Sequence, residues 1–373
     1  MNWKNNLSLW LILSALVFSC KPPAVQQTGG EVLDTLHLKY ANGFEIIQHK
    51  NYKNLRIYGV GDEHDYVDDF NLVSRDDSFA MQAPNAIPVP CKHIICLSST
   101  QLTYFFALDN IEDIVAINSS RHLEHKGMNA RVDSGLVKKV GKEGHFNTEL
   151  IVSLNPDVIF ISPFKRGGFD MLKSLGIPLV PMAAYEEKTP LGRAEWVKMI
   201  AAFTGQEQKA DSIFEGIAHR YNTLKHLTTN VEYRPTIFSG KLRSGTWYVP
   251  GGESFYAQYF KDAGADYVIK DQEQAAYPLD FESMYVKAAN ADVWRLLLTE
   301  AKGYNKEAMY AEDPRYGDFK AFKSGKIIAC NIRVKPYYEQ NAMKPDIILA
   351  DYIHFLHPEL LPNHHPEFYE LLK

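Results

Sequence analysis

The chain has 373 residues, 46% hydrophobic and 23% charged, which is long enough for two domains with cores of their own. Its net charge of −5 and its pI near 6.2 speak against nucleic-acid binding, which usually requires a basic face. A mean hydropathy of −0.26 excludes a polytopic membrane protein, and four cysteines are too few for a disulfide scaffold.

The first twenty residues differ from the rest and have the layout of an export signal. Lys4 precedes an apolar run, Leu7–Phe18, that is too short to span a bilayer comfortably. The segment Leu16–Cys20 (LVFSC) resembles a bacterial lipobox, although a cleaved signal with an incidental cysteine is the alternative. We therefore expect lipidation at Cys20 and a periplasmic protein held to a membrane. The expected segments are a signal peptide over 1–19 and a lipidated tether over 20–30.

Residues 31–89 predict a β-rich extension, because short alternating stretches such as Leu36–Tyr40 and Leu55–Val60 are typical of antiparallel strands. A first lobe is expected over 90–188. Its opening elements are a buried strand, a hydroxyl-rich turn, a helix and a second strand, at His93–Leu97, Ser98–Thr100, Gln101–Leu108 and Ile114–Ile117. This order is typical of an α/β fold.

Two stretches of the chain repeat the same order of elements. Asn147 opens an apolar-periodic helix over Leu150–Leu154, followed by a buried strand, Val158–Ile161. Asp280 likewise opens a helix that reaches Ala289 and is followed by the strand Val293–Leu298. In both stretches a polar loop, a short helical segment and another strand come next, at 162–180 and at 299–330. The repeat predicts two similar lobes.

A helical connector is expected over 189–228, with a kink or break near Thr204 and Gly205. Residues 229–373 then form the second lobe and a C-terminal helix. The predicted fold is α/β, with two Rossmann-like lobes of parallel-rich sheets joined by a long backbone helix.

This plan resembles the solute-binding proteins of ABC importers, in the group with a rigid helical backbone that carries cobalamin, ferric siderophores, haem or bare metal ions. The motif Glu149–Phe160 (ELIVSLNPDVIF) is very similar to the signature of that family. The second-lobe counterpart fits less tightly, since its helix is longer and Ala291 replaces the proline. The resemblance implies a ligand cleft between the lobes and a permease dimer in the inner membrane as partner.

Glu149 and Glu282 occupy matching positions, each second in a helix after a capping Asn147 or Asp280. An acid in the first turn of a helix complements the helix dipole, which is the plain structural explanation. The resemblance implies a second role, in which one glutamate per lobe pairs with arginines of the permease.

The loops that follow strands are the candidates for ligand contact, because ligands of open α/β sheets bind at the carboxyl ends of the strands. These loops are rich in cations and aromatic residues, which suit a large, anionic and partly planar ligand. We expect a metal chelate, with iron–siderophore, haem and cobalamin left open. The candidate residues are Ser99, Thr100, Lys165, Arg166, Tyr185, Lys241, Arg243, Trp247, Tyr248, Arg333 and Tyr337.

Three other interpretations remain open. A bare metal ion would need about three histidines and a carboxylate, and His122, His125 and His145 are the candidates in the first lobe. No phosphate loop, nucleophile elbow or zinc helix indicates an enzyme, so no catalytic residue, resident metal or cofactor is expected. The third interpretation is a scaffold lipoprotein that has kept the fold but binds no ligand.

The three remaining cysteines of the sequence are Cys91, Cys96 and Cys330. We expect three buried thiols, with a bridge between Cys91 and Cys96 as the alternative in an oxidising compartment.

Overall fold

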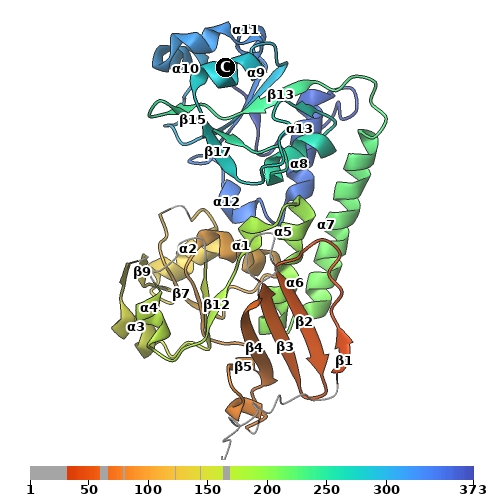
Figure 1. Ribbon diagram of the computed structural model, residues 1–373. Coiled ribbons are helices and arrows are strands. Elements are labelled where there is room, and N and C mark those ends of the chain that lie inside the picture. Colours follow the sequence, from red (N-terminus) through yellow and green to blue (C-terminus); the bar gives the residue numbers. More distant parts are fainter. Residues whose placement is uncertain (1–31, 59–65, 79, 122, 143, 163–168) are drawn as a thin grey trace, which may run out of the picture.

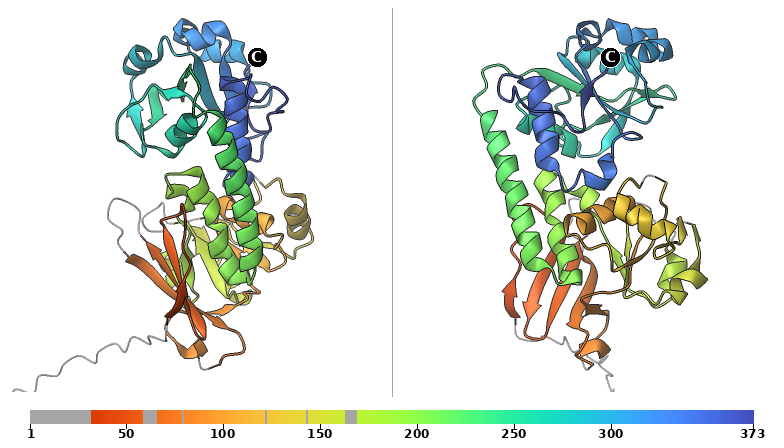
Figure 2. Two further views of the ribbon diagram at one scale, coloured as in Figure 1. Left: turned by 90° about the vertical axis from the view of Figure 1, so that its right-hand side faces the viewer. Right: turned by 180° about the vertical axis from the view of Figure 1, so that it is seen from behind.

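The computed structural model describes residues 32–58, 66–78, 80–121, 123–142, 144–162 and 169–373. Two α/β lobes lie one above the other, and a third, all-β unit packs beside the first lobe (Figure 1). The helix α7 (Glu207–Leu227) runs along both lobes on one side, as the turned views of Figure 2 show. No helix in the described ranges has the length and apolarity needed to cross a bilayer.

The all-β unit is a five-stranded sheet in chain order. Its strands are β1 (Val32–Thr35), β2 (Phe44–His49), β3 (Tyr52–Tyr58), β4 (Tyr66–Ser74) and β5 (Ala86–Val89). Neighbouring strands are antiparallel except β4 and β5, which are parallel. The buried face presents apolar side chains such as Phe44 and Leu55, whereas Glu45, Arg56 and Asp69 face one another across the opposite face. This alternation is what a sheet covered on one face requires.

Two buried carboxylates fasten this sheet to the connector. Glu195 accepts hydrogen bonds from the backbone amides of residues 39–41, at 2.8 Å from Tyr40 and 2.9 Å from Ala41. Glu187 accepts from the backbone amides of Asn42 and Gly43 at 2.9 and 3.0 Å. Since acceptors on the connector and just before it satisfy a turn of the β unit, the two parts form one body.

The first lobe contains a fully parallel sheet. Its strands are β6 (Ile94–Cys96), β7 (Ile114–Ile117), β8 (Lys138–Lys139), β11 (Val158–Ile161) and β12 (Leu179–Pro181), in the order β12-β11-β6-β7-β8. A small hairpin adds β9 (Gly141–Lys142) and β10 (His145–Phe146). The helices are α1 (Ser99–Ala107), α2 (Lys126–Asp133), α3 (Thr148–Ser153) and α4 (Asp170–Lys173).

The connector is three helices, α5 (Pro190–Glu195), α6 (Val197–Thr204) and the long α7. The break expected near Thr204 is confirmed, because Gly205 ends α6 with a left-handed φ of 69°.

The second lobe repeats the parallel sheet, with a closing antiparallel strand. Its strands are β13 (Thr236–Ser239), β16 (Asp266–Tyr267), β18 (Val293–Leu298), β19 (Ile327–Asn331) and β20 (Glu370–Leu371), in the order β16-β13-β18-β19-β20. A separate antiparallel sheet holds β14 (Leu242–Arg243), β15 (Thr246–Pro250) and β17 (Ala276–Leu279). The helices are α8 (Phe255–Asp262), α9 (Phe281–Ala288), α10 (Lys306–Glu312), α11 (Lys320–Ser324), α12 (Tyr337–Gln340) and α13 (Pro345–Leu356). Short 3₁₀ turns lie at Ala80–Gln82 (η1), Ala184–Glu186 (η2) and Pro314–Asp318 (η3).

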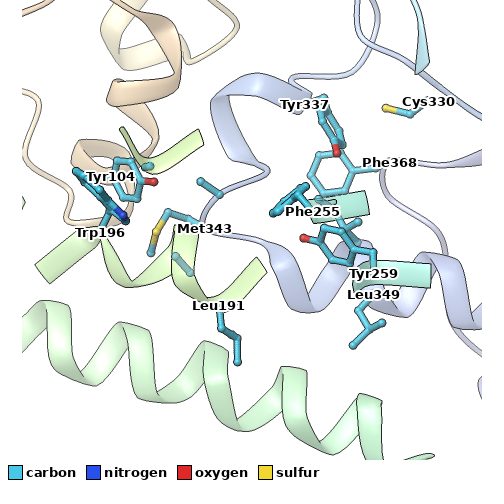
Figure 3. Close-up of a cluster of buried hydrophobic side chains, with 14 of the residues drawn as sticks. Tyr104, Leu191, Trp196, Phe255, Tyr259, Cys330, Tyr337, Met343, Leu349 and Phe368 are labelled. Carbon is cyan, nitrogen blue, oxygen red and sulfur yellow. The ribbon is translucent and has the colours of Figure 1, made fainter. Parts of the chain in front are cut away.

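One hydrophobic core runs through the whole molecule. A single cluster of buried side chains extends from the β unit through the connector into both lobes. Figure 3 shows its central part, where Tyr104 and Trp196 lie on one side of the contact between the lobes and Phe255, Tyr259 and Tyr337 on the other. A smaller cluster covers the other face of the first-lobe sheet. The two lobes therefore share apolar packing instead of meeting across a bare hinge.

Two segments expected to be loops are regular structure. Residues 241–248 form the hairpin β14–β15, and the segment 299–316 contains α10 and part of η3. The hairpin turn uses Ser244 and Gly245 with positive φ of 49° and 81°, the geometry of a tight two-residue turn. Cys91, Cys96 and Cys330 are buried free thiols, so the Cys91–Cys96 bridge is not formed.

Candidate ligand-binding site at the lobe junction

Segments that follow strands of both parallel sheets meet where the lobes touch, a region called the lobe junction below. The helix α12, which follows β19 of the second lobe, packs against α1, which follows β6 of the first. Glu339 of α12 accepts a hydrogen bond of 2.7 Å from the backbone amide of Glu124, in the segment after β7. The carboxyl ends of both sheets therefore face the junction, which is where ligands of open α/β sheets bind.

Glu339 makes this link from a buried position, with 3% of its surface exposed. Burial raises the pKa of its carboxyl group, and the hydrogen bond from Glu124 opposes that rise. The link is a polar contact that joins the two lobes directly.

Arg193, on the short helix α5, connects the lobes at a second point. Its guanidinium lies 3.3 Å above the ring of Phe255 in the second lobe, and its Nη2 donates to the carbonyl of Tyr185 at 2.5 Å. The hydroxyl of Tyr104 in the first lobe donates to the carbonyl of Arg193 at 2.8 Å. Burial lowers the pKa of Arg193, although the residue as a whole keeps partial exposure.

Arg295, on β18, lies deeper in the second lobe and is 3% exposed. Its guanidinium donates to the hydroxyls of Tyr352 and Tyr369 at 3.1 and 2.7 Å, and it lies 4.1 Å from the ring of Tyr256. Within the described residues neither Arg193 nor Arg295 has a carboxylate within 4.0 Å. The buried Arg295 and the partly exposed Arg193 are thus held by aromatic rings and neutral oxygens, an unusual arrangement because charges withdrawn from water are normally paired.

Tyr338 of α12 is an exposed tyrosine in the electrostatic surroundings of Arg295. It is 44% exposed, and its electrostatic surroundings include Tyr256, Arg295 and Arg243. Arg243 is exposed on the hairpin β14–β15. Cationic and aromatic side chains therefore extend from the surface of the second lobe into the junction, where they can offer charge pairing, hydrogen bonds and ring contacts.

Several residues proposed from the sequence lie at or near this junction. Ser99 and Thr100 are half-buried in the first turn of α1, and Tyr185 is half-buried in η2 beneath Arg193. Tyr337 begins α12 and is fully buried. Together with Arg243 these residues come from both lobes.

Other candidates have different surroundings. The expectation that Trp247 is exposed in a loop is wrong, because strand alternation turns its ring into the core beside Trp294, where its Nε1 donates to the carbonyl of Ser239. Lys241 is paired with Glu300 and Glu312 at 2.8 and 2.6 Å, so its charge is already balanced.

The remaining candidates are on the surface or outside the description. Tyr248 and Arg333 are exposed on the second lobe, without a described link to the junction. Lys165, Arg166 and Cys20 lie outside the described residues.

Sequence reasoning missed Arg193, Arg295, Tyr256 and Tyr259. A usable signal was present for Arg295, because it interrupts an otherwise apolar strand, VWRLLL, whereas Arg193 lies near a second charge, Glu195, in PLGRAEW. A charge at a position that periodicity assigns to the core calls for a partner, and here that partner is not a carboxylate of the described chain.

The two matched glutamates lie where the helix patterns place them. Glu149 is exposed in α3 after the cap Asn147, whose side chain accepts from Leu150 at 3.0 Å. Glu282 is exposed in α9 after the cap Asp280.

Each glutamate has an exposed valine about one turn further along its helix. Val152 of α3 is 52% exposed and Val286 of α9 is 83% exposed. Glu282 also faces Arg315 at 3.3 Å.

No group of three metal-binding side chains occurs in the described ranges. His125 caps α2, where its Nδ1 accepts from the backbone amide of Met128 at 3.1 Å, and its ring stacks on Phe106. His145 is exposed, and His122 lies outside the described residues. These positions do not support the bare-ion interpretation.

The related sequences among known proteins include two from Methanocaldococcus jannaschii that are named uncharacterized lipoproteins. One is 33% identical over 236 residues, which are 61% of this chain and 59% of that protein. The chain therefore matches less than two thirds of that relative's length. The other is 28% identical over 357 residues, covering 89% of this chain and 84% of that protein.

Among solved structures, a periplasmic heme binding protein from Pseudomonas aeruginosa has a TM-score of 0.58 at 13% identity. The match covers 76% of this chain and 98% of that one, and at this identity it shows the fold alone. The family described as periplasmic binding protein matches residues 94–333, from the first strand of one lobe to the turn after β19 of the other. Since that match spans well over half of the sequence, the chain belongs to the periplasmic binding protein family.

Proposed function

We propose that this protein is the substrate-binding lipoprotein of an ABC importer, and that it captures an anionic metal chelate at the lobe junction. The observation that carries the proposal is the cationic and aromatic character of the junction: Arg193 lies on the ring of Phe255 without a carboxylate partner among the described residues, and Arg295 adds a second unpaired cation deeper in the second lobe. A cargo that brings both negative charge and ring surface complements such a site.

An iron–siderophore complex, haem and cobalamin are the candidate cargoes. Anionic iron complexes and haem match the two cations better than a neutral ligand does, and one structural neighbour is named as a heme binder. A bare ion is disfavoured, because metal ions of that kind need several converging histidine, cysteine or carboxylate ligands.

The cargo assignment can be tested on protein purified from its own host. Native mass spectrometry should reveal a bound mass equal to a metal chelate, and calorimetric titration of the stripped protein with haem, ferric siderophores and cobalamin should identify it. Arg243→Gln should weaken an anionic chelate several-fold. The matched control is Arg234→Gln, which removes an exposed arginine hydrogen-bonded to Thr228. Failure of every chelate to bind would leave the scaffold lipoprotein as the better interpretation.

Delivery to the permease is proposed to use Glu149 and Glu282 with the adjacent Val152 and Val286. Each lobe presents an exposed carboxylate and an exposed apolar side chain on one short helix, which suits two equivalent pockets of a dimer, each lined by a cation and apolar groups. The double variant Glu149→Arg, Glu282→Arg should abolish import while leaving the chelate affinity unchanged. Normal import by this variant would refute the docking role.

Membrane attachment is proposed to depend on Cys20. The N-terminal segment supports this, as do the relatives that are named lipoproteins. Cys20→Ser should move the protein from the membrane fraction to the soluble fraction of the periplasm, and [³H]palmitate labelling should be lost. Retention of the label would place the lipid elsewhere.

A further inference from the structure

Three polar atoms at the lobe junction lack a hydrogen-bond partner in the described part of the chain. They are Nε of Arg193 and the hydroxyl oxygens of Tyr259 and Tyr337. The two tyrosine side chains have no exposed surface. Because buried polar groups in native proteins are almost always paired, each of these atoms calls for an explanation.

The three atoms belong to one neighbourhood. Arg193 stacks on Phe255, whose ring lies 5.1 Å from that of Tyr259, and α5 packs against α8. Tyr259 and Tyr337 both belong to the electrostatic surroundings of Arg193 and of each other. Figure 3 shows Phe255, Tyr259 and Tyr337 grouped in the second lobe where it meets the connector.

The chemistry of this set defines the missing partner. A guanidinium can only donate hydrogen bonds, and each tyrosine hydroxyl has a proton to donate. In the described ranges no carboxylate lies within 4.0 Å of Arg193. An acceptor with negative charge suits donors of this kind, and a carboxylate has two oxygens with about four acceptor positions.

We propose that Arg193, Tyr259 and Tyr337 form a seat for a carboxylate group. This deepens the proposed function, on which it rests for the source of the carboxylate: an acidic arm of the chelated cargo. A free carboxylate from solution has the same chemistry and is the other source. Arg193 is partly exposed whereas Tyr259 and Tyr337 are fully buried, so a carboxylate would reach the seat past the arginine side chain.

The variants Tyr259→Phe and Tyr337→Phe test the seat most cleanly, because each removes only an oxygen that has no partner in the described chain. We expect the ligand-free variants to be as thermally stable as the wild type. We expect affinity for a carboxylate-bearing chelate to fall about tenfold for each. Tyr221→Phe is the control, since its hydroxyl donates to Asp262 at 2.8 Å: it should lower the melting temperature and leave affinity unchanged.

The probes are haem, haem dimethyl ester, ferric citrate and sodium citrate, titrated calorimetrically into the full chain. If haem binds more tightly than its dimethyl ester, and Tyr337→Phe removes this difference, the seat binds a carboxylate arm of the cargo. Binding of sodium citrate alone, weakened by the same variants, identifies a free carboxylate and would count against chelate capture. Wild-type affinity of both Phe variants for a bound chelate would overturn the seat while the proposed function stands. If no probe binds the wild type, the seat fails, and the proposed function fails with it only if ferric siderophores and cobalamin do not bind either.

Discussion

Asp157 and Asp292 are the clearest matched residues of the two lobes. Asp157 accepts hydrogen bonds from the backbone amides of Lys92 and His93, just before β6, at 2.6 and 2.9 Å. Asp292 accepts from the backbone amide of Thr236, at the start of β13, at 2.8 Å. In each lobe an acid that precedes one central strand therefore fastens the beginning of its parallel neighbour. This explains why an aspartate stands at the same point of the repeated pattern.

Low pH should destabilise the second lobe, because Asp292 becomes protonated. Burial raises the pKa of Asp292, but hydrogen bonds from Lys320, Tyr233 and Thr236 outweigh this effect and lower the pKa below its ordinary value of 3.8. A lowered pKa means that the ionised form stabilises the fold above about pH 4 and that this stability is lost as the pH falls further. Denaturant unfolding between pH 2 and pH 7 should show this loss.

The variant Asp292→Asn isolates the effect. It should lower the free energy of unfolding by about 1–3 kcal/mol at pH 7, because a neutral amide accepts less well from these donors, and the gap between the two proteins should narrow as the pH falls from about 4 to about 2. Asp170→Asn, at a side chain that is 86% exposed, is the matched control and should follow the wild type. A constant gap between the curves of the wild type and Asp292→Asn would contradict the assignment.

Arg315 should weaken docking of the second lobe. It holds Glu282 at 3.3 Å and is itself held by Asp313, whereas Glu149 has no ion pair with the described residues. Exposed pairs of this kind are worth about 0.2–1 kcal/mol, so Arg315→Gln should tighten binding to the reconstituted permease by about 1.5- to 5-fold. Biolayer interferometry on permease nanodiscs measures this, with Arg234→Gln as control. Unchanged or weaker binding by Arg315→Gln would show that Glu282 is not the docking group.

At the scale of single elements, the buried strands were the most predictable part of the fold. The bounds Ile114–Ile117, Val158–Ile161 and Val293–Leu298 agree with the structure, because continuous apolar runs between polar residues mark parallel strands covered on both faces. The hairpin at 242–250 was missed, although Ser-Gly between alternating residues is a recognised turn signal. The helix Lys306–Glu312 was missed because its polar, tyrosine-containing sequence has a weak apolar stripe.

The site was less predictable than the elements. Sequence pattern identifies the loops that follow strands, but which of their side chains converge depends on the packing of one lobe on the other. Arg193 shows this, because its partner Tyr185 is close in sequence whereas its partner Phe255 lies in the other lobe and is distant in sequence. Trp247 was a candidate that does not reach the site. Its ring is buried because of the register in which β15 pairs with β17, and that register could not be predicted from the local sequence.

The break between α6 and α7 should depend on glycine. Gly205 has a left-handed φ of 69°, and a Cβ there would lie 3.2 Å from Pro90. Gly205→Ala should therefore lower the free energy of unfolding by about 1 kcal/mol. Gly216→Ala, inside the regular helix α7, should raise it by about 0.5–1 kcal/mol. Equal effects of the two changes, measured by urea unfolding, would contradict this account of the break.

At the scale of the whole molecule, the β unit should act as part of the connector. Glu195 is fully buried, accepts from the backbone amides of residues 39–41, and pairs with Lys198 at 3.2 Å. Glu195→Ala should lower the free energy of unfolding by about 3–5 kcal/mol, because it leaves three amides without their acceptor and leaves Lys198 with Asp211, at 3.5 Å, as its remaining carboxylate partner.

Limited proteolysis should reveal where that loss is felt. Glu195→Ala should make residues 32–58 sensitive to thermolysin at concentrations that spare the wild type. Glu215→Ala, which removes only the exposed pair with Lys39, should leave the digestion pattern unchanged. Resistance of the Glu195 variant would mean that apolar contacts alone hold the sheet to the connector.

The core shared by the lobes has a mechanical consequence. Pulling the lobes apart would expose to water rings such as Tyr104, Phe255 and Tyr337, which are now buried together. Exposure of apolar surface costs free energy in proportion to its area, so the resting protein is stiff about the junction. The work needed to widen the junction must then come from outside the protein, and the proposed ATP-driven importer, docked on both lobes, is able to supply it.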